Sequence, residues 1–198
     1  MRSLLARFES IPFPDRQLLD VGVVSFDNWP SKGGDEMSQL FRASELIELA
    51  ILIEKNGEEF YSSLRDSART ESLREVFSYL AGEEKRHLSI FKKLLGPLRR
   101  YEQRESYPGE YQAYMKAVAD SHVFIKKDVG EDLAKKAGKP IQAIDLALGF
   151  EKDTILFFDA MSHFIPAAEQ ETVGQLTNEE RKHIVRLRGL RDTMGKED

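Results

Sequence analysis

No cysteine occurs among the 198 residues of this sequence. The chain therefore has no disulfide bridge, no zinc site with cysteine ligands and no iron–sulfur cluster held by thiolates. Long apolar runs are also missing, because no stretch approaches the roughly 20 apolar residues that a membrane-spanning helix needs. The first residues, MRSLLARFES, turn acidic before any long apolar run and do not predict a signal peptide. We therefore expect a cytoplasmic protein that does not enter a membrane.

An excess of positive charge is likewise absent. The sequence has 29 lysines and arginines against 34 aspartates and glutamates, so its formal net charge is −5. This balance argues against a protein that binds nucleic acids or anionic membrane surfaces. The basic stretch at residues 182–191 lies near the end of a predicted helix, where positive side chains are favoured for a different reason. We therefore expect no nucleic-acid partner.

The 7 prolines and 13 glycines are few, yet several of them gather near the N-terminus. Residues that interrupt a regular helix there are Pro12, Pro14, Pro30, Gly33 and Gly34. The apolar stretch VGVVSF (21–26) and Trp29 favour an extended arm over residues 1–35, packed on its own domain or on a neighbouring subunit. A partly ordered tail is the alternative. Residues 36–198 have the length and apolar content of one domain with its own core.

Beyond the arm, apolar residues recur at spacings of three and four, which is typical of amphipathic helices. The helix that starts near residue 70 is expected to begin through a capping box, Ser72-x-x-Glu75, and to end at Gly96-Pro97. Pro140 suits the first residue of another helix. The expected helices cover approximately residues 35–66, 70–95, 110–123, 131–137, 140–163 and 166–190. The predicted fold class is therefore all-α, with four long helices and a long crossover that contains two short ones.

An internal repeat divides the four long helices into two helical hairpins of matching design. Residues 51–64 align with residues 148–161, and each stretch has a Glu-Lys pair followed by two adjacent aromatic residues. Each stretch is followed by a Glu-x-x-His motif, in GEEKRH (82–87) and in NEERKH (178–183). Each hairpin therefore carries one glutamate on its first helix and a Glu-x-x-His motif on its second.

The glutamates of this repeat lie on apolar helix faces. Glu54 precedes Glu84 by 30 residues, and Glu151 precedes Glu180 by 29. In each Glu-Glu pair the second glutamate is expected to face the core, whereas Glu179 and the flanking lysines and arginines are expected to face solvent. Burying an unpaired carboxylate costs several kcal/mol. Four of them in one core therefore require cations or protons to neutralise them.

A single Glu-x-x-His motif is most often a solvated turn of helix. Two such motifs, each about 30 residues after a glutamate on an apolar face, indicate a site for two metal ions in a four-helix core. Hard carboxylates hold iron or manganese, and imidazoles add affinity for borderline metals. The predicted metal ligands are Glu54, Glu84, His87, Glu151, Glu180 and His183.

On these motifs the sequence resembles the rubrerythrin branch of the ferritin-like di-iron carboxylate superfamily, over about residues 40–95 and 141–190. The resemblance implies a ferritin-like four-helix bundle and two iron ions, with manganese or zinc as substitutes. It also implies that Glu84 and Glu180 bridge the metals, that the other two glutamates are terminal ligands, and that each metal has one histidine. Tyr61 occupies the place of a tyrosine that lies beside the ligands in relatives, and it is the candidate catalytic residue.

The sequence departs from the family pattern in two ways. Without cysteine it cannot bind a rubredoxin-type iron, so an external donor protein must supply electrons to the metal pair. Thr154 stands where relatives tend to carry a further carboxylate; on the opposite half, Glu58 could supply a seventh carboxylate or be an ordinary surface residue. His122 and His163 have no carboxylate at ligand spacing, and we expect them to be ordinary polar residues.

The resemblance implies a non-haem di-iron oxidoreductase that reduces peroxide or dioxygen with electrons from the external donor. Two alternatives stay open: a ferroxidase that oxidises Fe(II) for iron storage, and a structural module stabilised by its metals. Mass in solution separates storage from the other functions, because storage needs a closed shell of many subunits. We expect a homodimer, because antiparallel bundles bury their remaining helix faces well in that way.

Overall fold

The fold is that of a computed structural model, which describes residues 42–98 and 109–194. All regular elements within these ranges are helices, which confirms the predicted all-α class. The predicted arm, residues 1–35, and the predicted start of the domain at residue 36 lie outside the described residues. No helix in the described ranges combines the length and the apolar character needed to cross a membrane.

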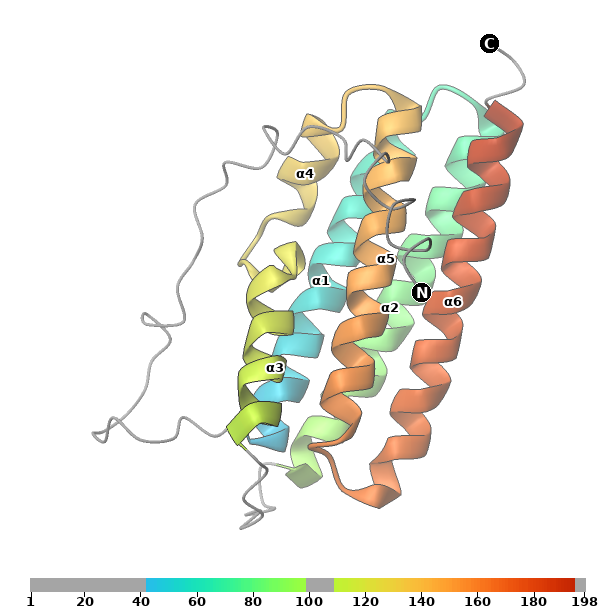
Figure 1. The fold of residues 1–198 in the computed structure, drawn as a ribbon. Coiled ribbons are helices and arrows are strands. Elements are labelled where there is room, and N and C mark those ends of the chain that lie inside the picture. Colours follow the sequence, from blue (N-terminus) through green and yellow to red (C-terminus); the bar gives the residue numbers. More distant parts are fainter. Residues whose placement is uncertain (1–41, 99–108, 195–198) are drawn as a thin grey trace, which may run out of the picture.

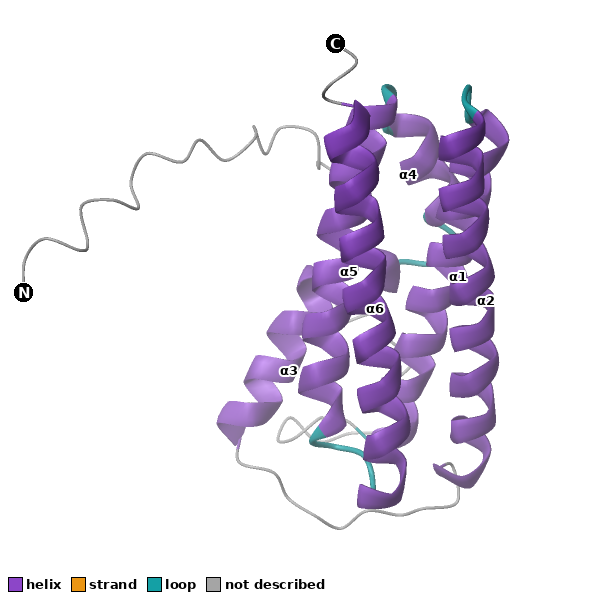
Figure 2. Ribbon diagram, turned by 90° about the vertical axis from the view of Figure 1, so that its right-hand side faces the viewer, coloured by secondary structure: helices purple, strands orange, loops and turns teal. Residues whose placement is uncertain are grey.

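Four long helices run side by side as a bundle (Figures 1 and 2): α1 (Ala43–Ser67), α2 (Glu71–Leu98), α5 (Pro140–Ser162) and α6 (Ala167–Met194). Helix α1 packs along α2, and α5 packs along α6. Short turns connect the members of each pair. This arrangement is the predicted bundle of two helical hairpins.

The chain crosses from α2 to α5 through three shorter elements: α3 (Gly109–Ser121), the 3₁₀ turn η4 (Val123–Ile125) and α4 (Gly130–Lys136). Helix α3 lies against α5, whereas η4 and α4 lie against α1. The crossover therefore covers one side of the bundle, as the yellow part of the ribbon shows in Figure 1. Both predicted short helices are present within one or two residues of their expected ends.

A buried amide side chain attaches the crossover to α1. The side-chain nitrogen of Asn56 donates hydrogen bonds to the carbonyl oxygens of Phe124, at 2.6 Å, and Lys126, at 2.8 Å. Its side-chain oxygen accepts a hydrogen bond from the backbone N–H of Val129 at 3.1 Å. Gly130 follows at a point of close approach, where an added Cβ would lie 2.1 Å from the carbonyl oxygen of Asn56. The Asn56 side chain thus satisfies backbone hydrogen-bonding groups of an irregular segment and holds this segment against the bundle.

The ends of the helices differ in part from the prediction. The hydroxyl of Thr70 accepts a hydrogen bond from the N–H of Leu73 at 3.4 Å, so Thr70 caps α2 and the predicted cap at Ser72 is wrong. Helix α2 also continues through Pro97 to Leu98. Proline is tolerated there because only the last turn loses a hydrogen bond, and the buried Leu98 favours one more residue of helix. The prediction that α5 begins at Pro140 is confirmed.

Aromatic side chains fill the core beside the middle of the bundle. The ring of Phe150 on α5 lies 4.4 Å from that of Phe124 and 5.2 Å from that of Phe60 on α1, centroid to centroid. Aromatic rings bury large apolar areas. They give the neighbouring polar groups an environment from which water is largely excluded.

Candidate metal centre

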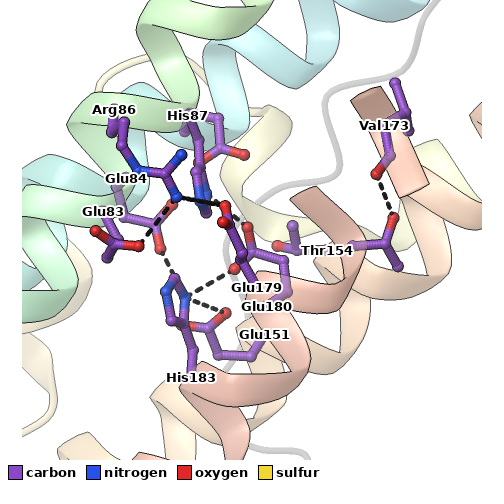
Figure 3. A network of polar contacts seen from close by, with 12 residues as sticks. Glu83, Glu84, Arg86, His87, Glu151, Thr154, Val173, Glu179, Glu180 and His183 are labelled. Atoms are coloured by element: carbon purple, nitrogen blue, oxygen red, sulfur yellow. Dashed lines mark hydrogen bonds and ion pairs between the residues drawn. The ribbon is translucent and has the colours of Figure 1, made fainter. Parts of the chain in front are cut away.

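The structure brings together all six residues that the sequence predicts as metal ligands. Helix α1 contributes Glu54 and α5 contributes Glu151, while α2 and α6 each contribute a Glu-x-x-His motif. All six side chains are buried, with exposed fractions between 0% and 5%. In Figure 3, Glu84, Glu151 and Glu180 point toward His183 from three different helices. Four helices therefore deliver one polar cluster to the apolar centre of the bundle.

Two of these residues belong to both halves of the cluster. One group consists of Glu54, Glu84, His87 and Glu180, and the other consists of Glu84, Glu151, Glu180 and His183. Within each group the ligand atoms lie within 4.8 Å of one another. Both groups contain Glu84 and Glu180, as expected of two carboxylates that each contact two metal ions. Each remaining residue belongs to one of these two groups, and the two histidines also form a third group with the half-buried Glu83.

The two histidines face the shared carboxylate of Glu180 with their Nδ1 atoms. The distance from Nδ1 to a Glu180 carboxylate oxygen is 2.8 Å for His87 and 2.8 Å for His183. His87 Nδ1 lies 3.6 Å from Glu54, and His183 Nδ1 lies 3.5 Å from Glu151. The imidazole rings stack with their centroids 5.6 Å apart and an interplanar angle of 15°.

The polar atoms of the cluster fit a pair of cations. Seven buried atoms make no hydrogen bond of acceptable geometry, although both Nδ1 atoms lie close to Glu180: both carboxylate oxygens of Glu54 and Glu180, Nδ1 of His87, and both ring nitrogens of His183. A buried polar atom without a partner costs about 1–3 kcal/mol, so this many in one place require an explanation. Carboxylate oxygens and imidazole nitrogens are ligands for iron, manganese and zinc. The donor set therefore fits two metal ions.

The carboxyl groups of the cluster differ in acidity. Burial, together with the neighbouring Glu84 and Glu180, raises the pKa of Glu54 well above its ordinary value. Burial also raises the pKa of Glu151, although a contact with His183 opposes it. Burial acts in the same direction on Glu180, but contacts with His183 and His87 outweigh it and lower the pKa of Glu180 to about 2.

The histidines respond in the opposite way. Burial lowers the pKa of each ring, but the surrounding carboxylates outweigh it and raise the pKa values of His87 and His183 above the ordinary value. Without metal, the folded protein therefore retains protons on Glu54, Glu151 and both imidazoles more strongly than the unfolded chain does. Metal ions must displace these protons to bind.

Tyr61, the predicted catalytic residue, contacts one half of the cluster only. It is buried on α1, and its hydroxyl donates a hydrogen bond to Oε1 of Glu151. The corresponding aromatic residue of the second hairpin, Phe158, packs against Phe91 with ring centroids 5.0 Å apart. Phe158 has no hydroxyl to donate, and both oxygens of Glu54 lack a partner. The internal repeat is therefore not symmetric at this centre.

Glu179 and Arg86 do not simply face solvent, as their sequence positions predict. The Nε2 atom of His87 donates a hydrogen bond to Glu179 at 3.0 Å. The guanidinium of Arg86 also donates to Glu179, and it donates to Glu83 at 3.0 Å. Because Nε2 of His87 is held on the outside, its Nδ1 is directed at the cluster, which is how outer residues orient metal ligands. The contacts with Glu179 cross from α2 to α6, so no spacing within one helix indicates them.

His122 and Thr154 form a second missed pair next to the cluster. His122 is buried in the crossover, and its Nε2 lies 3.1 Å from the hydroxyl oxygen of Thr154 on α5. Burial lowers the pKa of His122 to about 3. Glu58, the suggested seventh carboxylate, belongs to neither ligand group; its carboxylate lies 3.9 Å from Nζ of Lys85. His163 lies at the C-terminal cap of α5 and in neither ligand group.

Comparisons with known proteins agree with this architecture. The family model for Rubrerythrin matches residues 45–191. A protein of Thermotoga maritima, assigned as a ferritin-like diiron-carboxylate protein, has a similar fold in its crystal structure, with a TM-score of 0.56. The two sequences are 24% identical, and the match covers 77% of this chain and 95% of the Thermotoga chain. No curated protein matches the sequence.

Proposed function

Because the chain belongs to the rubrerythrin family, we propose that it is a non-haem di-iron oxidoreductase that reduces peroxide or dioxygen with electrons from an external donor protein. One observation carries the proposal: two overlapping ligand groups share Glu84 and Glu180, and Glu54, Glu180, His87 and His183 contribute buried donor atoms without a hydrogen-bond partner. A purely structural core would not concentrate unpaired carboxylates in this way.

Each ligand has a distinct role in the proposed centre. Glu84 and Glu180, which belong to both groups, would hold both ions. Glu54 and His87 would complete the ligands of one ion, and Glu151 and His183 would complete those of the other. Four carboxylates balance the charge of two divalent cations. The combination of oxygen and imidazole ligands suits iron, with manganese or zinc as substitutes.

Bound iron would supply two electrons, one from each ion, which matches the two-electron reduction of a peroxide. The protein contributes position and environment. Tyr61 holds the carboxylate of Glu151 through its hydroxyl, and Glu179 orients His87 through Nε2. The buried aromatic side chains beside the cluster limit access of water. Since the chain has no cysteine to bind a rubredoxin-type iron, electrons for the next cycle come from a separate donor protein.

Titration with Fe(II) and rapid mixing of the reduced protein with oxidants together test the proposed function. Anaerobic titration with Fe(II) is expected to saturate at two ions per chain, and Glu84→Ala should disturb both, because Glu84 belongs to both groups. Glu58→Gln is the matched control, since this glutamate lies one turn after Glu54 on α1 but outside both groups. The reduced protein is then mixed with peroxide and, separately, with dioxygen.

Each outcome of this experiment points to a different function. Faster oxidation by peroxide supports a peroxidase that stops after one cycle without a donor. Faster oxidation by dioxygen, followed by release of iron as a mineral, supports a ferroxidase instead. Two bound ions that react with neither oxidant would leave a structural role for the metals. Saturation at one ion per chain would contradict the two-metal assignment itself.

A further inference from the structure

A small cavity adjoins the ligand cluster on the side where α1, α5 and η4 meet. Two carboxylates of the cluster, Glu84 and Glu151, form part of its wall. The remaining lining residues are Ile53, Gly57, Tyr61, Phe124, Phe150 and Thr154. Most of these walls are apolar, so a molecule in the cavity would find few hydrogen-bond partners apart from the carboxylates and the two hydroxyl groups.

The hydrogen bonds of His122 determine what the Thr154 hydroxyl can do. Nδ1 of His122 accepts a hydrogen bond from the backbone N–H of Phe124 at 3.2 Å. A neutral imidazole has one protonated nitrogen, so its proton must be on Nε2, which donates to the Thr154 oxygen at 3.1 Å. The hydroxyl proton of Thr154 is then left over, and the structure gives it no acceptor among the described residues.

The other hydroxyl of the cavity is already engaged. Tyr61 donates its proton to Glu151, so it can offer only its oxygen to a ligand. Thr154 is therefore the side chain of this lining that can donate a hydrogen bond to a molecule in the cavity. Complete burial keeps His122 neutral at ordinary pH, which preserves this arrangement of protons.

We propose that this cavity binds the small oxidant, a molecule of two oxygen atoms such as peroxide or dioxygen, and that the Thr154 hydroxyl donates a hydrogen bond to it. His122 acts as a positioning residue, because it reaches the oxidant only through Thr154. The proposal rests on the oxidase or peroxidase function proposed above. It adds that the cavity is too small for a bulky organic substrate, so the centre selects its oxidant by size and by one neutral donor.

Azide is the probe for the Thr154 hydrogen bond, because it binds oxidised di-iron centres with a visible absorption band and accepts hydrogen bonds. In the iron-loaded protein, Thr154→Val keeps the volume of the side chain but removes the donor. Loss of one such bond is expected to weaken azide binding about fivefold to tenfold. Thr154→Ser retains the hydroxyl and should restore the affinity to within about twofold of the wild type.

Thr177→Val is the matched control. Thr177 is also 5% exposed, but its hydroxyl donates to the carbonyl of Val173 within α6, at 2.9 Å. This variant should bind azide as tightly as the wild type. Unchanged azide affinity in Thr154→Val, or an equal loss in Thr177→Val, would overturn the proposal.

The role of His122 is tested by a double-mutant cycle and by NMR. His122→Phe keeps an aromatic ring between Phe124 and Phe157, whose ring centroids lie 6.1 Å and 6.3 Å from that of His122. The double variant with Thr154→Val should bind azide no more weakly than Thr154→Val alone, and additive losses would show that His122 acts independently. In the zinc-loaded wild type, ¹⁵N spectra should show a neutral ring protonated at Nε2; a ring protonated at Nδ1 would also overturn the proposal.

Rates of reaction with the oxidants distinguish a failure of this proposal from a failure of the proposed function. Thr154→Val should slow oxidation of the reduced centre by roughly the same factor as it weakens azide binding, with whichever oxidant the wild type uses. A wild type that loads two irons and reacts rapidly, with Thr154→Val reacting equally fast, would refute the role of Thr154 and leave the function intact. A loaded wild type that reacts with neither oxidant would refute the function, while the azide series still decides whether Thr154 donates into the cavity.

Discussion

At the scale of single residues, the two halves of the centre have different supports. Glu151 receives a hydrogen bond from Tyr61, whereas both oxygens of Glu54 lack a hydrogen-bond partner. His87 is oriented from outside by Glu179, whereas Nε2 of His183 has no partner. The ligand types are the same in both halves, so any difference in metal affinity must come from these neighbours.

The hydroxyl of Tyr61 is expected to favour metal binding beside Glu151. Tyr61→Phe keeps the ring in the core but removes the donor to a carboxylate, a bond that contributes about 1.5–3 kcal/mol. We expect one of the two ions to bind at least about tenfold more weakly and the other to change little. Competitive titration with a chelator measures both affinities. Tyr79→Phe is the control, because Tyr79 is exposed and its ring lies 6.3 Å from that of His183. Equal weakening in both variants would contradict a specific role for Tyr61.

A glycine leaves room for a bridging carboxylate. An added Cβ at Gly57 would lie 3.2 Å from Oε2 of Glu84, so Gly57→Ala should shift this carboxylate, which belongs to both ligand groups, by a few tenths of an ångström. We expect weaker binding of both ions. Gly82→Ala is the matched control, because nothing lies within 4 Å of its added Cβ and alanine favours helix by about 1 kcal/mol. Titration and thermal unfolding of both variants check this; full metal affinity in Gly57→Ala would contradict it.

At the scale of secondary-structure elements, the crossover depends on one close contact with α1. The added Cβ of Gly130→Ala would lie 2.1 Å from the backbone oxygen of Asn56, and backbone cannot move aside as a flexible side chain can. We expect a loss of about 1–3 kcal/mol in the free energy of unfolding, as for other overpacked sites. Chemical denaturation measures it. Gly149→Ala in α5 meets nothing within 4 Å and should not be destabilised; an equal loss in both would contradict the close-contact explanation.

The helices and the ligand candidates could be predicted because their signals lie within single elements. Apolar spacing within each helix indicated α1, α2, α5 and α6, and the same spacing placed the glutamates among buried neighbours. The contact of Arg86 with Glu179, and that of His122 with Thr154, depend on how two elements are rotated against each other. No periodicity within one element reports that rotation. The cap at Thr70 was missed because Ser72 offers an equally good local pattern.

At the scale of the whole molecule, the pairing of two hairpins brings carboxylates and imidazoles into one cluster. Their pKa shifts in this cluster determine how the stability of the fold depends on pH. Without metal, the pKa values of Glu54 and Glu151 are raised by burial, and those of His87 and His183 are raised by the carboxylates. Such groups stabilise the fold fully below their ordinary pKa values, and this contribution is lost as pH rises through the raised values. Glu180 behaves oppositely: its pKa is lowered to about 2, so its contribution to stability is lost as pH falls from the ordinary value of a glutamate toward 2.

The metal-free protein should therefore become less stable as pH rises from about 6 to about 9, whereas added metal should stabilise it more at the higher pH. Metal replaces the protons that the cluster loses, and an ion at about 100 times its Kd contributes about 2.7 kcal/mol. Thermal unfolding of the chelated and zinc-loaded protein across this range provides the measurement. Glu54→Gln with Glu151→Gln should flatten the metal-free profile and reduce the effect of metal, while Glu58→Gln should change neither. Two results would contradict convergence of the carboxylates on one metal centre. One is a melting temperature of the metal-free protein that rises with pH, and the other is a melting temperature that is the same for the chelated and the zinc-loaded protein.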